Sequence, residues 1–154
     1  MALPNKVLPG FSASLYAQSG SSPTVLTNTQ LATYASVSAI AVSGNVVPVE
    51  SIPAFGQDDA SANFAVAGSR QSDKIPVQSA PTSMTITAAW NPSDTVLLLM
   101  RADAYSGTVD RTFVIAATDG TNIVYYSFNG RVSQFHIDSQ PGAEAKCTFT
   151  INPR

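Results

Sequence analysis

Apolar and polar residues alternate with a period of two through much of this 154-residue chain, and no other feature constrains its fold as strongly. The stretch TSMTITAAW, residues 82–90, shows the pattern most cleanly. Its larger apolar side chains fall on one side of an extended chain: Met84, Ile86, Ala88 and Trp90. A period of two is typical of β-strands that turn one face towards a core. We therefore predict a mainly β protein.

Turn signals divide the rest of the alternating sequence into further strands. The predicted strands are FSASLYA at 11–17, RTFVIAA at 111–117, NIVYYSF at 122–128, RVSQFHID at 131–138 and EAKCTFTIN at 144–152. The turns between the last four fall at Asp119-Gly120, Asn129-Gly130 and Gln140-Pro141-Gly142. Because Asp-Gly between two apolar runs is a strong hairpin signal, we expect antiparallel pairing.

The middle of the chain gives two less regular predictions. Residues 35–52, ASVSAIAVSGNVVPVESI, carry apolar residues at both parities around Ile40 and Val42. This pattern predicts a second strand that is covered on both faces. Residues 52–81 follow as a long loop, longer than the roughly 12–15 residues that structureless loops in compact domains reach. Such a loop is expected to be functional.

One helix interrupts the strands. After Trp90 the period changes, and Asn91, Pro92 and Asp94 suit an N-cap, a first helical position and a negatively charged first turn. We predict a helix at about 92–104, with Gly107 just past its end as a left-handed cap. The expected fold is an antiparallel β-sandwich or barrel of about seven strands with this helix on its flank. It occupies a single domain, 1–154, with an N-terminal arm at 1–10.

No motif for catalysis or cofactor binding is present, so we predict that the protein is not an enzyme and holds no cofactor or metal. Gln134, His136 and Asp138 share one face of a predicted strand, but serines and aspartates are too common here for a triad to carry information. One histidine and one aspartate are also too few ligands for a closed zinc site. Glu50, Asp58 and Asp59 lack the spacing of a calcium loop and are expected to be solvated.

Composition excludes other classes. Charged residues make up 12% of the chain and the net charge is -2, which disfavours proteins that grip a phosphate backbone. The longest apolar run, 96–100, is too short to span a bilayer, so we expect no membrane insertion by this chain. Cys147, the only cysteine, is expected to be a small core side chain on a strand, and synthesis in a cytoplasm is the simplest account.

The order of these elements resembles the tail tube proteins of long-tailed bacteriophages. The matching segments are FSASLYA after a proline-rich arm, VESIPAFGQDDASANF entering the long loop, SMTITAAWNPSD at the strand-to-helix junction, and VYYSFNGRVSQFHI with EAKCTFTIN at the end. The resemblance covers nearly the whole chain. We favour the non-contractile type of tail, although no residue pattern separates it from the contractile type.

The resemblance implies a structural subunit that forms stacked hexameric rings, and hence a tube that conducts DNA from a virion into the host. Its implied partners are other copies of itself, the tape-measure protein and tail-terminator or tail-tip proteins, while DNA passes without specific binding. Two alternatives stay open. One is a secretion-system tube of the same architecture. The other is a carbohydrate-binding or adhesin-like β-sandwich, for which Tyr125 and Tyr126 are poorly placed because they point to opposite faces.

Two sets of residues are expected to serve assembly and the channel. Channel-facing positions alternate with the core positions Val37, Phe135 and Ile137, and are Ser36, Ser38, Gln134, His136 and Asp138. The 52–81 loop is expected to be an arm, in one form a hairpin, that reaches a neighbouring subunit or ring; the alternative is that Phe55 and Phe64 fold back on their own domain. Its contact residues are Phe55, Asp58, Asp59, Phe64, Arg70, Asp73 and Lys74.

Overall fold

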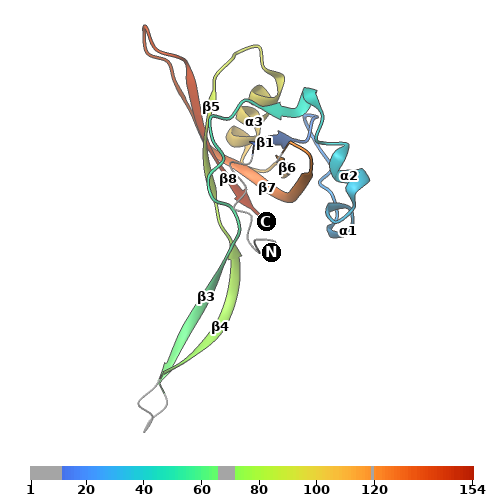
Figure 1. The fold of residues 1–154 in the computed structure, drawn as a ribbon. Helices are drawn as coiled ribbons and strands as arrows, with labels where there is room; N and C mark the ends of the chain where they lie inside the picture. Colours follow the sequence, from blue (N-terminus) through green and yellow to red (C-terminus); the bar gives the residue numbers. More distant parts are fainter. Residues whose placement is uncertain (1–11, 66–71, 119) are drawn as a thin grey trace, which may run out of the picture.

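A computed structural model describes residues 12–65, 72–118 and 120–154, and its main feature is one curled sheet of six antiparallel strands in the order β2-β1-β6-β7-β8-β5 (Figure 1). The strands of this sheet are β1 Ser12–Ala17, β2 Val46–Val47, β5 Met84–Ala89, β6 Arg111–Thr118, β7 Ile123–Asp138 and β8 Lys146–Pro153. A separate hairpin pairs β3 Gln57–Ala65 with β4 Ser72–Pro81. The helices are α1 Asn28–Leu31, α2 Tyr34–Ser38, the 3-10 turn η1 Ser43–Asn45 and α3 Thr95–Ser106. The mainly β fold with one principal helix is thus confirmed.

The two edges of the sheet are joined by the short chain segment from Val46 to Glu50. At its start this segment pairs with β1, where Val47 lies opposite Leu15. Just beyond, the backbone N–H of Ala89 in β5 donates to the Pro48 carbonyl at 2.9 Å, and the Glu50 N–H donates to the Thr87 carbonyl at 3.0 Å. Residue 48 uses only its carbonyl in this pairing, so a proline, which has no backbone N–H to donate, fits here. The sheet therefore curls into a half-barrel whose edges meet at one end.

Helix α3 closes the inside of this half-barrel. Leu97 and Met100 are fully buried against the strands, together with Phe113, Phe149 and Cys147. The core positions of β5 and β8 alternate as the sequence predicts, with Met84, Ile86 and Ala88 paired to Ile151, Phe149 and Cys147. Cys147 is a core side chain, as expected.

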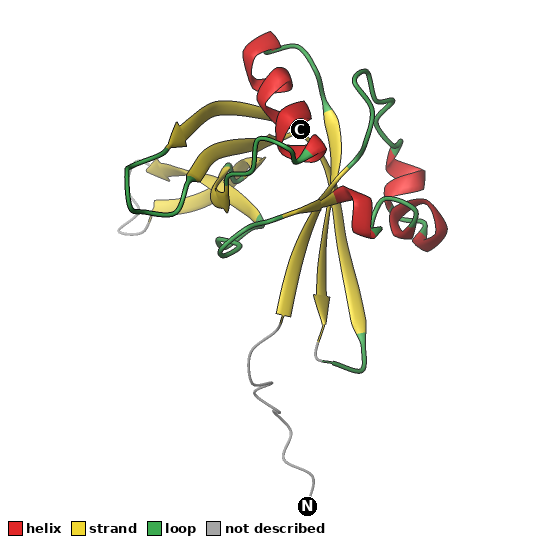
Figure 2. Cartoon of the chain, turned by 90° about the horizontal axis from the view of Figure 1, so that it is seen from above, coloured by secondary structure: helices red, strands yellow, loops and turns green. Residues whose placement is uncertain are grey.

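A second, smaller cluster covers the outside of the sheet over β1, β6 and β7. Val37 and Ile40 pack there against Val114, with Tyr16 and Tyr125 beside them. Figure 2 shows the two short helices and α3 on different sides of the sheet. The first five residues of β6 are therefore buried on both faces.

The predicted strand over 35–52 is wrong, because the chain there forms α2, η1 and only the two-residue strand β2. Of the apolar residues that suggest a doubly covered strand, Ile40 is buried and Val42 is 46% exposed. Ile40 packs with Val37, which lies three residues earlier and faces the same side of a helical turn. A capping box also marks this helical region, since Thr27 and Gln30 exchange side-chain and backbone hydrogen bonds at the start of α1. Ser36 and Ser38 therefore lie on α2 and not on a strand, which removes the alternation that placed them in the channel.

Helix α3 begins later than predicted. Its N-cap is Asp94, whose carboxylate accepts hydrogen bonds from the N–H groups of Val96 and Leu97, and not Asn91. The Asn91 side chain instead accepts from the Ser93 N–H and holds the turn before the helix. Gly107 ends the helix in the left-handed conformation, with φ 64, as expected. No helix in the described part of the chain is long and apolar enough to cross a membrane.

Strand β7 runs unbroken through Asn129 and Gly130, where the sequence predicts a bend. Gly130 serves close packing and not a turn. A Cβ at this position would lie 3.0 Å from Cγ2 of Ile151 and 3.2 Å from the Asn152 carbonyl oxygen on β8. The glycine therefore allows the backbones of β7 and β8 to approach closely, a common reason for a glycine inside a strand.

The segment predicted as a loop over 52–81 is mostly the β3–β4 hairpin, which projects away from the body (Figure 1). At its root the Thr82 N–H donates to the Gly56 carbonyl at 3.2 Å. The register shifts between Ala60 and Ser61, where Ser61 lies opposite Pro76. A proline cannot donate to a ladder, so a bulge at this point is expected physically.

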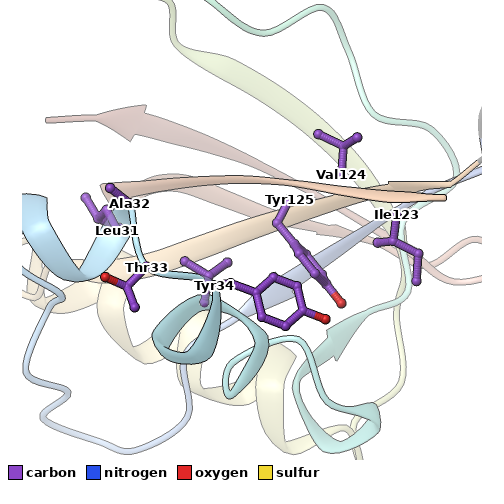
Figure 3. A pocket seen from close by; sticks show the side chains of 8 residues that line it. Leu31, Ala32, Thr33, Tyr34, Ile123, Val124 and Tyr125 are labelled. Atoms are coloured by element: carbon purple, nitrogen blue, oxygen red, sulfur yellow. The ribbon is translucent and has the colours of Figure 1, made fainter.

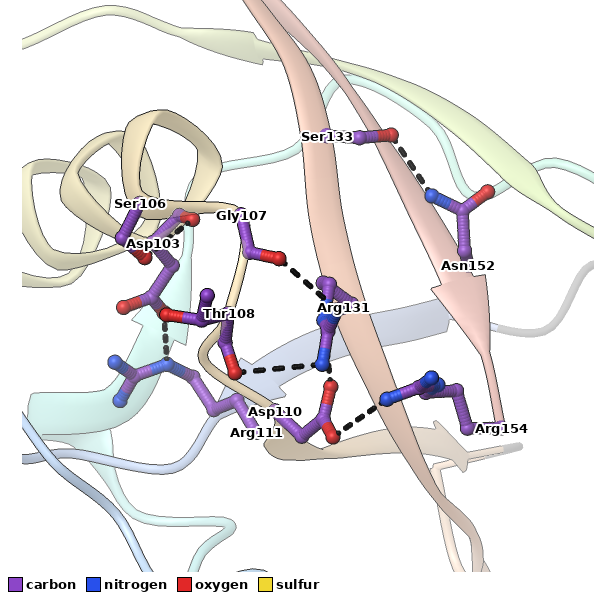
Figure 4. Close-up of polar contacts among 10 residues, drawn as sticks. All are labelled: Asp103, Ser106, Gly107, Thr108, Asp110, Arg111, Arg131, Ser133, Asn152 and Arg154. Carbon is purple, nitrogen blue, oxygen red and sulfur yellow. Dashed lines mark hydrogen bonds and ion pairs between the residues drawn. The ribbon is translucent and has the colours of Figure 1, made fainter.

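A buried ion pair ties α3 to the sheet (Figure 4). Nε of Arg111 donates to the Asp103 carboxylate at 2.7 Å, and both side chains are almost fully buried. Nη1 of Arg111 also donates to the carbonyls of Gln18 and Gly20, while Nη2 has no partner among the described residues. One side chain thus joins the end of the helix, the first residue of β6 and the turn after β1.

Candidate channel and assembly surfaces

A polar and uncharged surface covers the outside of β5, β8 and the second half of β7. We call it the polar face, and it consists of Ser83, Thr85, Thr87, Ser133, Gln134, His136, Thr148, Asn152 and Thr150, the last of which is buried among its neighbours. These side chains alternate with the core positions of the same strands. The polar face is the part of the outer sheet surface that α2 does not cover.

Side-chain hydrogen bonds run across the polar face from strand to strand. Ser83 donates to Oδ1 of Asn152 at 2.8 Å. Nδ2 of Asn152 in turn donates to the Ser133 hydroxyl at 2.8 Å (Figure 4). A parallel chain links the hydroxyls of Thr85 and Thr150 at 3.2 Å. Because these neutral side chains bond to one another, few of their donors and acceptors remain free to bind a passing molecule.

A bulge at Gln134 sets which residues of β7 reach the polar face. Gln134 has a positive φ of 54, and the register shifts between Ser133 and His136. The extra residue turns Phe135 inwards, where its ring stacks on Phe149 with centroids 5.7 Å apart. Gln134, His136 and Asp138 are exposed, and His136 lies opposite Thr148. Ile137, predicted to be a core residue, is 40% exposed, although it lies opposite the buried Cys147.

Charged side chains lie at the two ends of the polar face. At one end Asp138 lies opposite Lys146, whose Nζ is 2.5 Å from Oε1 of Glu50. At the other end Arg131 and Arg154 both bind the Asp110 carboxylate. The hydrogen bond from Arg131 lowers the pKa of Asp110 below its usual value, so this carboxylate is ionised at neutral pH. Among the described residues, no group of three potential metal ligands occurs, and Glu50 is occupied by Lys146.

The hairpin holds most of the residues expected to serve assembly. Asp58 and Asp59 lie near its root, opposite Ala80 and Ser79. Phe64 lies far out on β3, opposite Asp73, and Lys74 is the next residue of β4. Arg70 lies outside the described residues. The hairpin thus brings Phe64, Asp73 and Lys74 together at register positions remote from the body.

Phe55 lies at the base of the hairpin and touches its own domain. Its ring meets that of Tyr126 edge-on, with centroids 5.1 Å apart, and 40% of the residue is exposed. Tyr126 and its neighbour Val124 are themselves about half-exposed. Alternation alone could not reveal this surface, because these residues follow the core pattern of β7 and become exposed only where the sheet extends past its cover.

A groove also opens on the other face of the same strands, between the helical segment and the start of β7. It has a volume of about 300 Å³ and is bounded by Leu31, Thr33, Tyr34, Ile123 and Tyr125. The rings of Tyr34 and Tyr125 converge in it, with centroids 5.6 Å apart (Figure 3). Two faces of the β1–β6–β7 end therefore expose aromatic and aliphatic side chains, which is typical of surfaces that contact other proteins.

The features described so far are a curled sheet joined at its edges, a polar outer face, a projecting hairpin and exposed apolar ends. No protein-family model matches the sequence, and no curated protein sequence matches it. Solved structures of other proteins, however, are similar to it in fold. A chain of the cryo-EM structure of the anti-feeding prophage baseplate, symmetrised six-fold, is similar with a TM-score of 0.61 and 8% identity over 100% of this chain and 94% of that one.

The tail tube of SPP1, determined by solid-state NMR and cryo-EM, is also similar. Its TM-score is 0.55 and its identity 10%, over 92% of this chain and 72% of that one. At these identities the comparisons show the fold alone. That fold is the fold of a phage-like tail tube protein, as the sequence resemblance predicts.

Proposed function

We propose that this protein is a structural subunit of a tail tube, in a phage tail or a related injection system, and that it assembles with itself. The observation that carries the proposal is the fold match, which spans most of both chains in each comparison and includes a tail tube structure. The six-fold symmetry of one matching structure supports the finer proposal of six subunits in each ring, with rings stacked into a tube.

The polar face supports a channel that conducts DNA without holding it. Each lysine or arginine that reaches a phosphate adds a salt-dependent attraction, because bound counterions are released. The nine residues of the polar face include no lysine or arginine. We therefore propose this surface, with Gln134, His136 and Asp138, as the channel lining. Residues of the hairpin, including Phe64, Asp73 and Lys74, are proposed to contact the adjacent subunit or ring.

The similarity to a baseplate structure supports a second candidate of the same architecture, an injection or secretion tube whose cargo is not DNA. The two functions differ in their partners. Genes for a capsid and a tape-measure protein beside this one would favour the phage tail, as part of a virion. Genes for secreted effectors and no capsid would favour the second candidate.

Concentrated purified protein is expected to form rings or tubes that negative-stain electron microscopy can see. The physical reason is that contact with other copies would bury the apolar side chains exposed in the described part of the subunit and would give the hairpin a partner. Class averages along the tube axis should show six subunits. Monomers at every concentration, salt and pH tested would contradict the assembly proposal.

Substitution of Thr85 by Lys is expected to leave tubes intact and to make them bind duplex DNA, more tightly at 50 mM than at 200 mM salt. Thr85 is exposed at the centre of the polar face, so the new charge would line the channel six times in each ring. Filter binding of DNA to assembled tubes measures the effect. Leu98 on α3 is also exposed, and Leu98→Lys adds the same charge elsewhere. Equal DNA binding by both variants would show that the polar face is not the lining.

A further inference from the structure

An apolar hollow lies on the inner face of the sheet at its free end, beyond the cover of α3. Its volume is about 250 Å³ and its lining residues are Ala13, Phe55, Ile115, Ala117, Val124 and Tyr126. A second hollow of about 200 Å³ lies on the other side of the Phe55–Tyr126 ring pair and includes Met84 and Phe128. No charged residue is among the described lining residues of either hollow.

Within the described part of the chain, the hollow is an uncovered continuation of the protein core. Ile115 is fully buried and pairs with both Leu15 of the core and Tyr126 of the hollow. One register step further, Ala13, Ala117 and Val124 lie side by side on three neighbouring strands. Val124 and Tyr126 are 49% and 46% exposed there. A core face that continues into solvent is unfavourable unless another apolar segment covers it.

Residues 1–11, which lie outside the described part of the chain, have the composition and attachment point of such a cover. They lead directly into Ser12 of β1, and Ala13 lines the hollow. Their sequence, MALPNKVLPGF, holds Leu3, Val7, Leu8 and Phe11 and a single charged side chain, Lys6. Pro4 and Pro9 favour extended backbone, and an extended segment of this length spans roughly 30 Å, enough to cross both hollows.

We propose that residues 1–11 fold back over the apolar hollow of their own subunit before assembly and cover Val124 and Tyr126. The occupant is the subunit's own segment because attachment at Ser12 gives it an effective concentration of about millimolar at the hollow, above that of a second copy in dilute solution. The cover keeps the subunit from associating through this face until a neighbour displaces it. The inference goes beyond the tube function, since it describes the single subunit.

Cysteine crosslinking in dilute protein tests the proposal. Leu8→Cys is combined with Val124→Cys and treated with a short bismaleimide crosslinker. The matched control is Leu8→Cys with Ile123→Cys, because Ile123 is the neighbouring residue, is 56% exposed and points to the opposite face of β7. Cys147 can remain, since it is 1% exposed and burial raises the pKa of its thiol to about 11.

The variant with Leu8→Cys and Val124→Cys should crosslink within one subunit at least roughly ten-fold faster than the control variant, at a rate that does not depend on protein concentration. Equal rates for the two variants would overturn the proposal, because a tethered segment without a docking site reaches both faces. Crosslinked dimers in place of intramolecular products would also overturn it, since the hollow would then take a second copy. Neither result depends on whether the protein forms tubes.

Discussion

Tubes are expected to disappear when the β3–β4 hairpin is removed, while the body of the subunit still folds. The variant replaces residues 58–80 by Asn-Gly, which supplies a tight turn between Gln57 and Pro81, residues that already pair across the hairpin. Electron microscopy should show no tubes. The free energy of unfolding should stay within about 1 kcal/mol of that of the unaltered subunit, because in the described structure β3 and β4 form a sheet of their own.

A milder variant tests whether one contact residue matters for assembly when the hairpin keeps its full length. Phe64→Ser keeps the full hairpin and removes one large apolar side chain far from the body, so it should weaken assembly without changing subunit stability. A fall in subunit stability with tubes still forming, in either variant, would show that the hairpin belongs to the fold of its own domain and not to the interface.

Loss of the buried carboxylate at Asp103 is expected to destabilise the subunit by about 3–5 kcal/mol, a large part of the roughly 5–15 kcal/mol that holds a typical domain together. In Asp103→Ala the guanidinium of Arg111 keeps its bonds to the Gln18 and Gly20 carbonyls but remains charged and buried without a counter-charge. Equilibrium denaturation by urea measures the change in the free energy of unfolding.

The exposed ion pairs of Asp110 offer the matched control. Asp110→Ala removes an aspartate that pairs with two arginines, Arg131 and Arg154. Its side chain is 31% exposed, so the free energy of unfolding should fall by at most about 1 kcal/mol. The double variant Asp103→Leu with Arg111→Met should recover most of the stability lost in Asp103→Ala, because no buried charge remains. A loss at Asp103 no larger than that at Asp110 would show that the buried pair is not a structural link.

The strands that could be predicted from sequence are those whose two faces meet different surroundings. In β5 and β8 one face meets the core and the other is the polar face, so alternation reports both the element and its orientation. The end of α3 is equally clear because Gly107 takes the conformation that other residues avoid. The predicted start lies too early because Asn91 and Asp94 are both good caps, and tertiary packing decides between them.

Other features depend on contacts between distant residues. The bulge at Gln134 changes the parity of β7, because Val132 faces the core before it and Phe135 faces the core after it. Its local mark is slight: two consecutive polar residues, Ser133 and Gln134, interrupt the alternation. Gly130 looks like a turn residue until Ile151 is placed beside it. The sequence around Val37 resembles a strand because its apolar residues fall at both odd and even positions, which is also the pattern of a strand buried on both faces. Its spacing of three between Val37 and Ile40 is the available signal.

The junction from Val46 to Glu50 also has a kinetic consequence. Strands β6, β7 and β8 follow one another through short turns, whereas β1 pairs with β6 and β5 with β8 across long stretches of chain. The junction must find both of these outer strands, so it can dock only after each has joined the central three. Since closure of long loops slows folding, the last step in building this subunit should be the sealing of its sheet, and the earliest the meander at its centre.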